Sequence, residues 1–138
     1  MIFESHAHYD DEAFDEDREE LLEGLREAGV GKVINVSASV EGMESSLALA
    51  GKYPFIYAAV GVHPDGVGEM DGKVIARMHS LARDPKTVAI GEIGLDYYWD
   101  KENHEVQKKW FREQLGVARE EKLPFIIHSR EAAADTLE

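Results

Sequence analysis

Short apolar runs alternate with longer amphipathic segments along the whole chain. The runs are rich in Val, Ile and Ala and do not alternate strictly with polar residues, as expected for strands that are covered on both faces. They begin 24 to 36 residues apart, which is the spacing of βα units. We predict strands over residues 2–5, 32–36, 56–61, 88–91 and 124–127.

Between these runs, apolar residues recur at helical spacing. The segments with this spacing are 17–28, 41–50, 74–82, 106–121 and 131–137. The first is followed by Gly29, a residue type that commonly ends a helix. The residues expected to face the core from the fourth segment are Val106, Trp110, Leu115 and Ala118.

Alternating strands and helices predict an α/β fold with a parallel sheet and right-handed crossovers. Two architectures fit, a doubly wound open sheet and part of a (β/α) barrel. A whole eight-stranded barrel takes about 250 residues, whereas this chain has 138 and holds about five βα units. As a barrel, residues 1–138 would form a single domain, the N-terminal part of the barrel, that ends in the fifth helix.

Composition narrows the class of protein. Hydrophobic residues make up 43% and charged residues 31% of the chain, as in soluble globular proteins. The lack of cysteine excludes a disulfide scaffold and a thiolate zinc site. No apolar run approaches the roughly 20 residues of a membrane span, and the N-terminus does not resemble a secretory signal. We therefore expect a cytoplasmic protein with no membrane partner.

The charge of the chain bears on its partners. Asp and Glu number 28 against 15 Lys and Arg, which gives a net charge of −13 at pH 7. Proteins that bind nucleic acid through electrostatics alone are usually basic, so the charge argues against a simple nucleic-acid-binding module. Bound divalent cations would offset the repulsion locally, which leaves a metal-dependent enzyme open.

Four of the six histidines follow predicted strands, where the functional residues of parallel α/β folds lie. His6 and His8 follow the first strand, and their spacing puts both imidazoles on one side of an extended chain, where they can bind one metal ion. His63 follows the third strand and His128 the fifth. Glu92 follows the fourth, where a buried carboxylate requires a cation or hydrogen-bond donors.

Each of these residues also has an ordinary structural interpretation. The histidine pair can be polar residues at a strand end, and His63 before a proline can be a turn residue. Glu92 can pair with Lys or Arg, and His128 can donate to a core carbonyl. Arg130 can grip a phosphate or pair with a neighbouring acid, and Tyr97 can stack on a base or pack its loop. Independent structural roles do not explain why the histidines and the glutamate all follow strands. Together they indicate a hydrolytic metal centre, which would activate a bound water and polarise the scissile group.

The segments that carry these residues resemble the TatD-like metal-dependent deoxyribonucleases of the amidohydrolase superfamily. In order, they are ESHAH at 4–8, GVHP at 61–64, AIGEIGLDYY at 89–98 and LPFIIHSREA at 123–132. The third is very specific. Because all four occur in order at family-like spacing, the resemblance covers essentially the whole chain.

The resemblance implies a (β/α)8 TIM-barrel hydrolase, here truncated to about five βα units, with divalent metal ions. Two ions are expected, of Mg, Mn or Zn. By the resemblance, His6 and His8 would bind the first ion, Glu92 would bridge both ions, and His128 would bind the second.

The resemblance also implies a substrate and the residues beside it. The family activity is hydrolysis of DNA phosphodiesters, commonly from the 3′ end of single strands. His63 would act beside the metals or the bound substrate, in a catalytic and a substrate-binding role, with Arg130 and Tyr97 near the DNA. Glu92 would be catalytic as well as a metal ligand.

Members of that family are about twice as long as this chain, and a histidine on the sixth strand and an aspartate on the eighth complete their metal site. We therefore expect a truncated gene product or a partial chain, with self-association through the open barrel edge. Two alternatives stay open: a hydrolase of a small ester or amide from the same superfamily, and a non-catalytic half-barrel. A substrate panel would test the first, and metal binding would test the second.

Overall fold

The computed structural model describes residues 2–98, 104–132 and 136. Five strands alternate with four α-helices and two short 3-10 helices. In chain order, the elements are β1 (Ile2–Ala7), η1 (Glu12–Phe14), α1 (Arg18–Glu27), β2 (Val30–Val36), α2 (Val40–Lys52), β3 (Ile56–Val60), η2 (Pro64–Glu69), α3 (Gly72–Ala82), β4 (Thr87–Asp96), α4 (His104–Glu121) and β5 (Phe125–Arg130).

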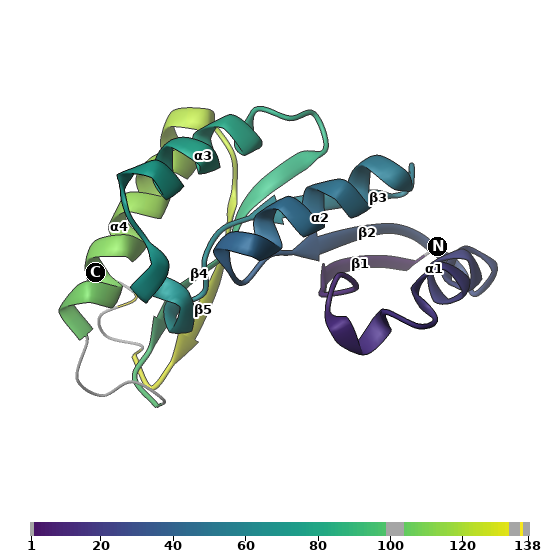
Figure 1. Ribbon diagram of the computed structural model, residues 1–138, viewed down its shortest axis with the longest axis horizontal. Helices are drawn as coiled ribbons and strands as arrows, with labels where there is room; N and C mark the ends of the chain where they lie inside the picture. The colour runs from purple at the N-terminus through teal and green to yellow at the C-terminus, as the bar shows by residue number, and fades with distance from the viewer. Residues whose placement is uncertain (1, 99–103, 133–135, 137–138) are drawn as a thin grey trace.

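The strands form one parallel sheet in the order β1-β2-β3-β4-β5. Each strand lies beside the strand that precedes it, whereas a doubly wound sheet reverses its order at a switch point. The order therefore decides between the two predicted architectures in favour of a (β/α) barrel segment. Figure 1 shows the strongly twisted sheet, with α2, α3 and α4 along one side of it.

The core lies between the sheet and its helices. Its largest cluster joins β3 and β4 to α3 and α4, with Met78, Ile90, Ile93 and Phe111 among its members. A second cluster packs α1 and α2 against β2 and β3. On the other face of the sheet, the buried cluster consists of the smaller set Val36, Ala59 and Ala89. Most of the buried apolar side chains thus lie between the sheet and the helices, where they hold the strands in place.

Local signals fix the starts of two helices. Ser39 precedes α2, and its hydroxyl accepts a hydrogen bond from the Gly42 N–H. Asp71 precedes α3, and its carboxylate accepts from the Val74 N–H. Such side chains satisfy backbone donors that a helix leaves free at its first turn. After α1, Gly29 has a φ of +97°, which confirms the helix-ending role predicted for it.

The five predicted strands and the first four predicted helices are all present. Several strand ends and one core position differ from the prediction: β1 continues to Ala7 and β5 to Arg130, so His6 and His128 lie in strands rather than after them. The fourth strand was expected to end at residue 91 but continues to Asp96, because it stays paired with β5 along that stretch. On α4, Val106 is 43% exposed rather than facing the core, since Gln107 and Gln114 occupy the buried side. The fifth predicted helix, over 131–137, falls largely outside the described residues.

The two outer strands form the edges of the sheet. Within the described part of the chain, β1 pairs with β2 alone and β5 with β4 alone. Phe125 and Ile127 on β5 are exposed although they are large and apolar. Among the same residues, no helix combines the length and the apolar character needed to cross a lipid bilayer.

Candidate metal centre

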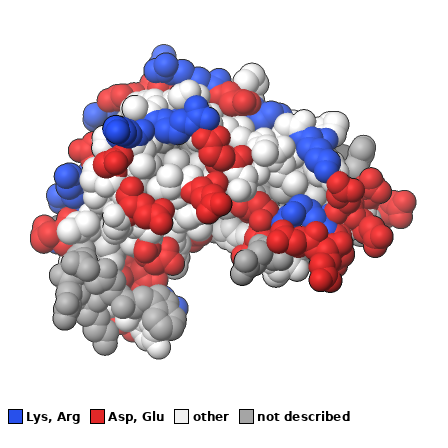
Figure 2. Space-filling model, in the orientation of Figure 1, with Lys and Arg blue, Asp and Glu red and all other residues white. Residues whose placement is uncertain are grey.

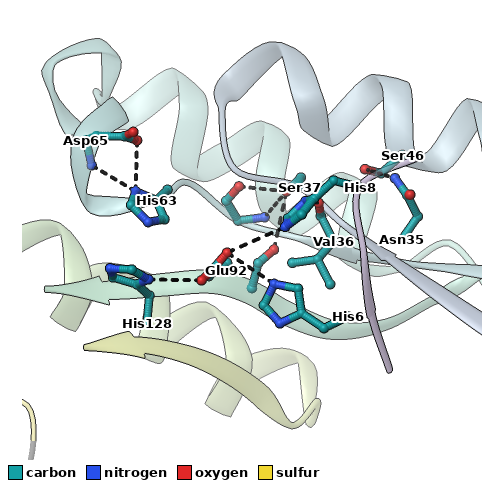
Figure 3. A network of polar contacts seen from close by, with 12 residues as sticks. His6, His8, Asn35, Val36, Ser37, Ser46, His63, Asp65, Glu92 and His128 are labelled. Atoms are coloured by element: carbon teal, nitrogen blue, oxygen red, sulfur yellow. Dashed lines mark hydrogen bonds and ion pairs between the residues drawn. The ribbon is translucent and has the colours of Figure 1, made fainter. Parts of the chain in front are cut away.

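The carboxyl ends of the strands bring the predicted ligands together. His6 lies in β1 and His8 directly after it, while Glu92 lies in β4 and His128 in β5. His63 follows β3. Figure 3 shows the four imidazoles arranged around the carboxylate of Glu92. The structure thus brings together all five residues that the sequence marked at the ends of strands.

The first group of potential ligands is His6, His8 and Glu92, whose ligand atoms lie within 4.8 Å of one another. The Nε2 atoms of His6 and His8 lie 3.3 and 3.9 Å from Oε2 of Glu92. Nδ1–H of His8 donates to the Val36 carbonyl oxygen at 2.7 Å, which leaves Nε2 directed at Glu92. A backbone acceptor on the far nitrogen is the usual way in which a metal-binding imidazole is oriented.

The second group is His63, Glu92 and His128, whose ligand atoms meet the same distance limit. Nδ1 of His128 lies 3.1 Å from Oε1 of Glu92, and the rings of His63 and His128 have centroids 4.2 Å apart. The two carboxylate oxygens of Glu92 thus face different groups: Oε2 faces the β1 imidazoles and Oε1 faces β5. One side chain is common to both groups.

A buried serine ties the strands beneath Glu92. The Ser37 hydroxyl accepts from the Gly61 N–H at 2.8 Å and donates to the Gly61 carbonyl at 2.6 Å. The Glu92 N–H donates to the Ser37 carbonyl at 2.8 Å. The ends of β2 and β3 and the middle of β4 are therefore joined by hydrogen bonds next to the potential ligands.

Two buried glutamines of α4 hold the backbone at strand ends. Oε1 of Gln114 accepts from the Val62 N–H at 2.7 Å, and its Nε2 donates to the Val62 carbonyl at 3.2 Å. Gln107 makes the same pair of bonds with Asp96, at 2.8 and 3.1 Å. Each glutamine satisfies both backbone groups of one residue, next to His63 in the first case and at the end of β4 in the second.

A buried asparagine of β2 has a similar role beside β1. Oδ1 of Asn35 accepts from the Tyr9 N–H at 2.6 Å. Its Nδ2 donates to Asp10 and to the Ser46 hydroxyl, each at 2.9 Å. The loop that follows His8 is therefore fixed to β2 and α2.

These buried amides and Ser37 were not predicted from the sequence, because polar residues in helices and at strand ends are normally solvated. One signal was present. Gln107, Phe111, Gln114 and Ala118 follow one another at intervals of four, three and four residues, which is one helical face. Two glutamines on an otherwise apolar face indicate buried hydrogen-bonding partners.

Two glycines let β4 and β5 approach closely. A Cβ atom on Gly94 would collide with the carbonyl oxygen of His128, and the φ of Gly94 is +146°. A Cβ atom on Gly91 would lie 2.7 Å from the Cβ of Ile126. Because Gly94 is the pairing partner of His128 in the sheet, the glycines allow His128 to lie beside Glu92.

The residues predicted to contact substrate lie at the β4–β5 side of the centre. The Arg130 guanidinium lies over the ring of Tyr98, 4.0 Å from its centroid, and Tyr98 is exposed. Tyr97 instead stacks on His104, with the ring centroids 3.5 Å apart, and packs against the core. The exposed aromatic ring of this pair is therefore that of Tyr98, and substrate binding by Tyr97 stays a prediction.

A cleft of about 590 Å³ opens beside the potential ligands His8, His63 and Glu92. Four further carboxylates line it, those of Asp10, Asp11, Glu41 and Asp65. Among the described residues, no Lys or Arg lines this cleft. Figure 2 shows acidic side chains gathered over the α1 end of the molecule as well, so an anionic ligand meets repulsion here unless cations intervene.

The donor set fits divalent cations. Imidazole nitrogens suit Zn²⁺ and other first-row ions, and carboxylates also suit Mg²⁺ and Mn²⁺. In addition, the orienting hydrogen bond on His8 is already made. Fold and donor set together define a (β/α) barrel protein with a candidate centre for divalent metal ions.

Comparison with known proteins identifies the family. The model of the TatD related DNase family matches residues 3–138. The uncharacterized metal-dependent hydrolase YabD of Bacillus subtilis is 39% identical over 137 residues, which are 99% of this chain and 54% of that protein. The 3'-5' ssDNA/RNA exonuclease TatD of Cronobacter sakazakii is 36% identical over 88% of this chain and 46% of its own length.

A solved structure supports the same family. The crystal structure of YjjV, a TatD homolog from Escherichia coli, superposes on this chain with a TM-score of 0.90 and 35% sequence identity. The superposition covers 98% of this chain and 53% of the YjjV chain. The chain belongs to the TatD related DNase family, so the family and the barrel fold predicted from the sequence are confirmed. The chain spans about half the length of the relatives that it matches.

Proposed function

We propose that this chain carries the divalent-metal ligands of a hydrolase that cleaves DNA phosphodiesters from the 3′ ends of single strands. His6, His8 and Glu92 would hold one ion, and Glu92 and His128 a second. The observation that carries the proposal is the position of Glu92, whose two oxygens face two separate sets of imidazoles. Bound divalent cations would supply activation of a water and polarisation of the scissile phosphate.

The remaining roles belong to side chains around this centre. His63 lies beside His128 and lines the cleft, so it would contact a phosphate oxygen or hold a proton there. Arg130 and Tyr98 form a stacked pair of a cation and an aromatic ring, which suits a nucleotide because guanidinium binds phosphate and the ring stacks on bases. Tyr97 would support this loop from its position against the core.

The choice of DNA rests on the family and on charge. The cleft is lined by carboxylates, and a polyanion would enter it only with cations bound, which agrees with a metal-dependent reaction. The Cronobacter sakazakii relative is named as an exonuclease of single-stranded DNA and RNA. A small neutral ester would need no such compensation, so a hydrolase of small esters or amides remains the second candidate.

Release of nucleotides from 3′-labelled single-stranded DNA by the 138-residue chain tests the proposal. We expect cleavage that requires added Mn²⁺. Glu92→Gln keeps the size of the side chain and removes its charge, and should reduce cleavage by more than the ~10–100-fold that loss of an outer-sphere partner causes. The matched control is Glu44→Gln, an exposed glutamate paired with Arg77 on α2 and α3, which should keep full activity.

Each other outcome has a defined meaning. Equal cleavage by the unaltered chain and by Glu92→Gln would indicate a contaminating nuclease. Cleavage of aminoacyl esters or lactones without cleavage of DNA would favour the second candidate. A folded chain that binds no Zn²⁺ or Mn²⁺ and cleaves nothing would support the non-catalytic half-barrel.

Three expectations concern the chain as a whole. We propose that it forms one domain and associates with itself through the edges of β1 and β5, since exposed Phe125 and Ile127 lie on β5. Sedimentation at several protein concentrations measures this, and a monomer at every concentration would contradict it. A cytoplasmic location stays a prediction from the sequence.

A further inference from the structure

Asp96 is a buried carboxylate at the end of β4 that faces the same histidine as Glu92. It is 3% exposed. Its Oδ2 lies 3.0 Å from Nε2 of His128, while Oε1 of Glu92 lies 3.1 Å from Nδ1 of the same ring. His128 is therefore held between two carboxylates, one at each ring nitrogen.

We propose that Asp96 is the positioning residue of His128: it accepts the Nε2–H, so that the lone pair of Nδ1 is directed at Glu92 and the ion beside it. The inference rests on the proposed function in that it takes His128 to be a metal ligand. Asp96 itself touches neither the ion nor the substrate in this assignment. Its effect is carried by the orientation and the tautomer of the imidazole.

The number of protons on the His128 ring determines which nitrogen can bind the ion. A neutral imidazole carries one N–H, and only the nitrogen without it can bind a metal ion. Glu92 lies between both groups of potential ligands, so Nδ1 is the nitrogen of His128 that faces the centre. The proton then belongs on Nε2, where Asp96 supplies the acceptor. A carboxylate behind a metal-binding histidine fixes its tautomer and raises its basicity.

The surroundings of Asp96 keep this acceptor in place. Both of its backbone groups are bonded to the buried amide of Gln107, and its Oδ1 accepts the Tyr98 N–H at 3.0 Å. By contrast, Asp65 also contacts a histidine of the site, Nδ1 of His63 at 2.8 Å, but its side chain is exposed. A buried carboxylate that is itself held by hydrogen bonds can orient a ring, whereas an exposed carboxylate can move and is screened by water.

Asp96→Asn is the variant that tests the role. An asparagine keeps the size of the side chain but has an acceptor oxygen at only one of the two positions, whereas the Tyr98 N–H and the His128 Nε2–H meet different oxygens of Asp96. We expect Zn²⁺ binding measured by calorimetry to weaken by about 10–100-fold, the loss typical of partners behind metal ligands. Asp17→Asn, an exposed aspartate before α1, is the matched control and should leave the affinity unchanged.

The tautomer of His128 provides a readout that a purely structural role would not change. Long-range proton–nitrogen NMR at pH 8, above the ordinary titration range of imidazole, should show the proton on Nε2 in the unaltered protein without metal. In Asp96→Asn we expect a mixture of the two tautomers. Circular dichroism confirms that the variant is folded.

Two results would overturn the inference. One is an Nδ1–H tautomer of His128 in the unaltered protein, which decides the matter even if Asp96→Asn does not fold. The other is a folded Asp96→Asn with unchanged Zn²⁺ affinity and tautomer. Failure of the proposed function gives a different pattern, in which the unaltered chain binds no metal ion while His128 still carries its proton on Nε2.

Discussion

The two sides of the candidate metal centre are built differently. On the β1 side, the side chains of His6 and His8 are 40% and 42% exposed. On the β4–β5 side, those of Glu92 and His128 are 12% and 24% exposed. His6 and His8 thus lie in and just after the edge strand β1, and their side chains are open to solvent. Glu92 on the inner strand β4 and His128 on the opposite edge strand β5 are more buried.

The backbone beneath each side follows the same division. On the β4–β5 side, Gln107 bonds both backbone groups of Asp96, and Gly94 allows the close approach of the strands. On the β1 side, Asn35 accepts one backbone N–H and bonds otherwise to side chains. Ligands on a rigid frame lose less freedom on binding an ion. We infer that the β4–β5 side is the more preorganised of the two, and that on the β1 side the ring of His8 is already oriented by the Val36 carbonyl.

The largest expected effect comes from breaking the rigid side with Gly94→Ala. The new methyl group meets the His128 carbonyl, and the φ of +146° is strained for alanine. We expect a loss of about 3 kcal/mol or more in the free energy of unfolding, measured by urea denaturation. Gly116→Ala is the control, since a Cβ there meets nothing within 4 Å and alanine favours the helix. A Gly94→Ala variant as stable as the unaltered chain would contradict the close β4–β5 contact.

An intermediate effect is expected from Gln114→Leu. The change leaves the N–H and carbonyl of Val62 without their buried partner, which costs about 1–3 kcal/mol. Because Val62 precedes His63, NMR signals of the His63 ring should shift more than those of His6. Equal shifts in both rings would show that the glutamine does not act locally on the end of β3.

The smallest effect is expected from Glu121→Gln, which lies outside both sides. Hydrogen bonds from Arg83 and then from His79 hold the pKa of the Glu121 carboxyl below its ordinary value. A carboxyl whose pKa is lowered in the folded state stabilises the protein at pH values above its ordinary pKa. This stabilisation is lost as the pH falls through the lowered pKa.

The variant should therefore melt slightly below the unaltered chain at pH 7, and the difference should vanish as the pH falls to where Glu121 is protonated. Zn²⁺ affinity should not change. Thermal melts at several pH values measure this, and a difference that grows toward acid pH would have the wrong sign.

The sequence predicted the elements well because each strand is a short apolar run between helical patterns. The strand ends then marked Glu92 and the four histidines around it, since polar residues after buried strands share one edge of a parallel sheet. Strand order was not predictable in this way. Periodicity locates elements, but two architectures with the same elements differ only in which strands pair.

The residues that support the candidate metal centre could not be predicted either, and the reason is different. Gln107, Gln114 and Ser37 are buried only because particular backbone groups of distant strands lie opposite them. The spacing along α4 indicates that the two glutamines are buried, but neither composition nor spacing identifies the backbone groups that they bond. The same applies to Asp96, whose neighbour in space is 32 residues away in the chain.

Glu92 has one consequence for how the centre would fill with ions. Its two oxygens serve two groups of imidazoles, so an ion in one group alters the charge and the orientation of a ligand in the other. Such coupling is reciprocal, because each ion must change the affinity of the other by the same factor. The order of loading and the cooperativity between the two positions would therefore be set by a single side chain, and a titration with metal would not follow two independent binding curves.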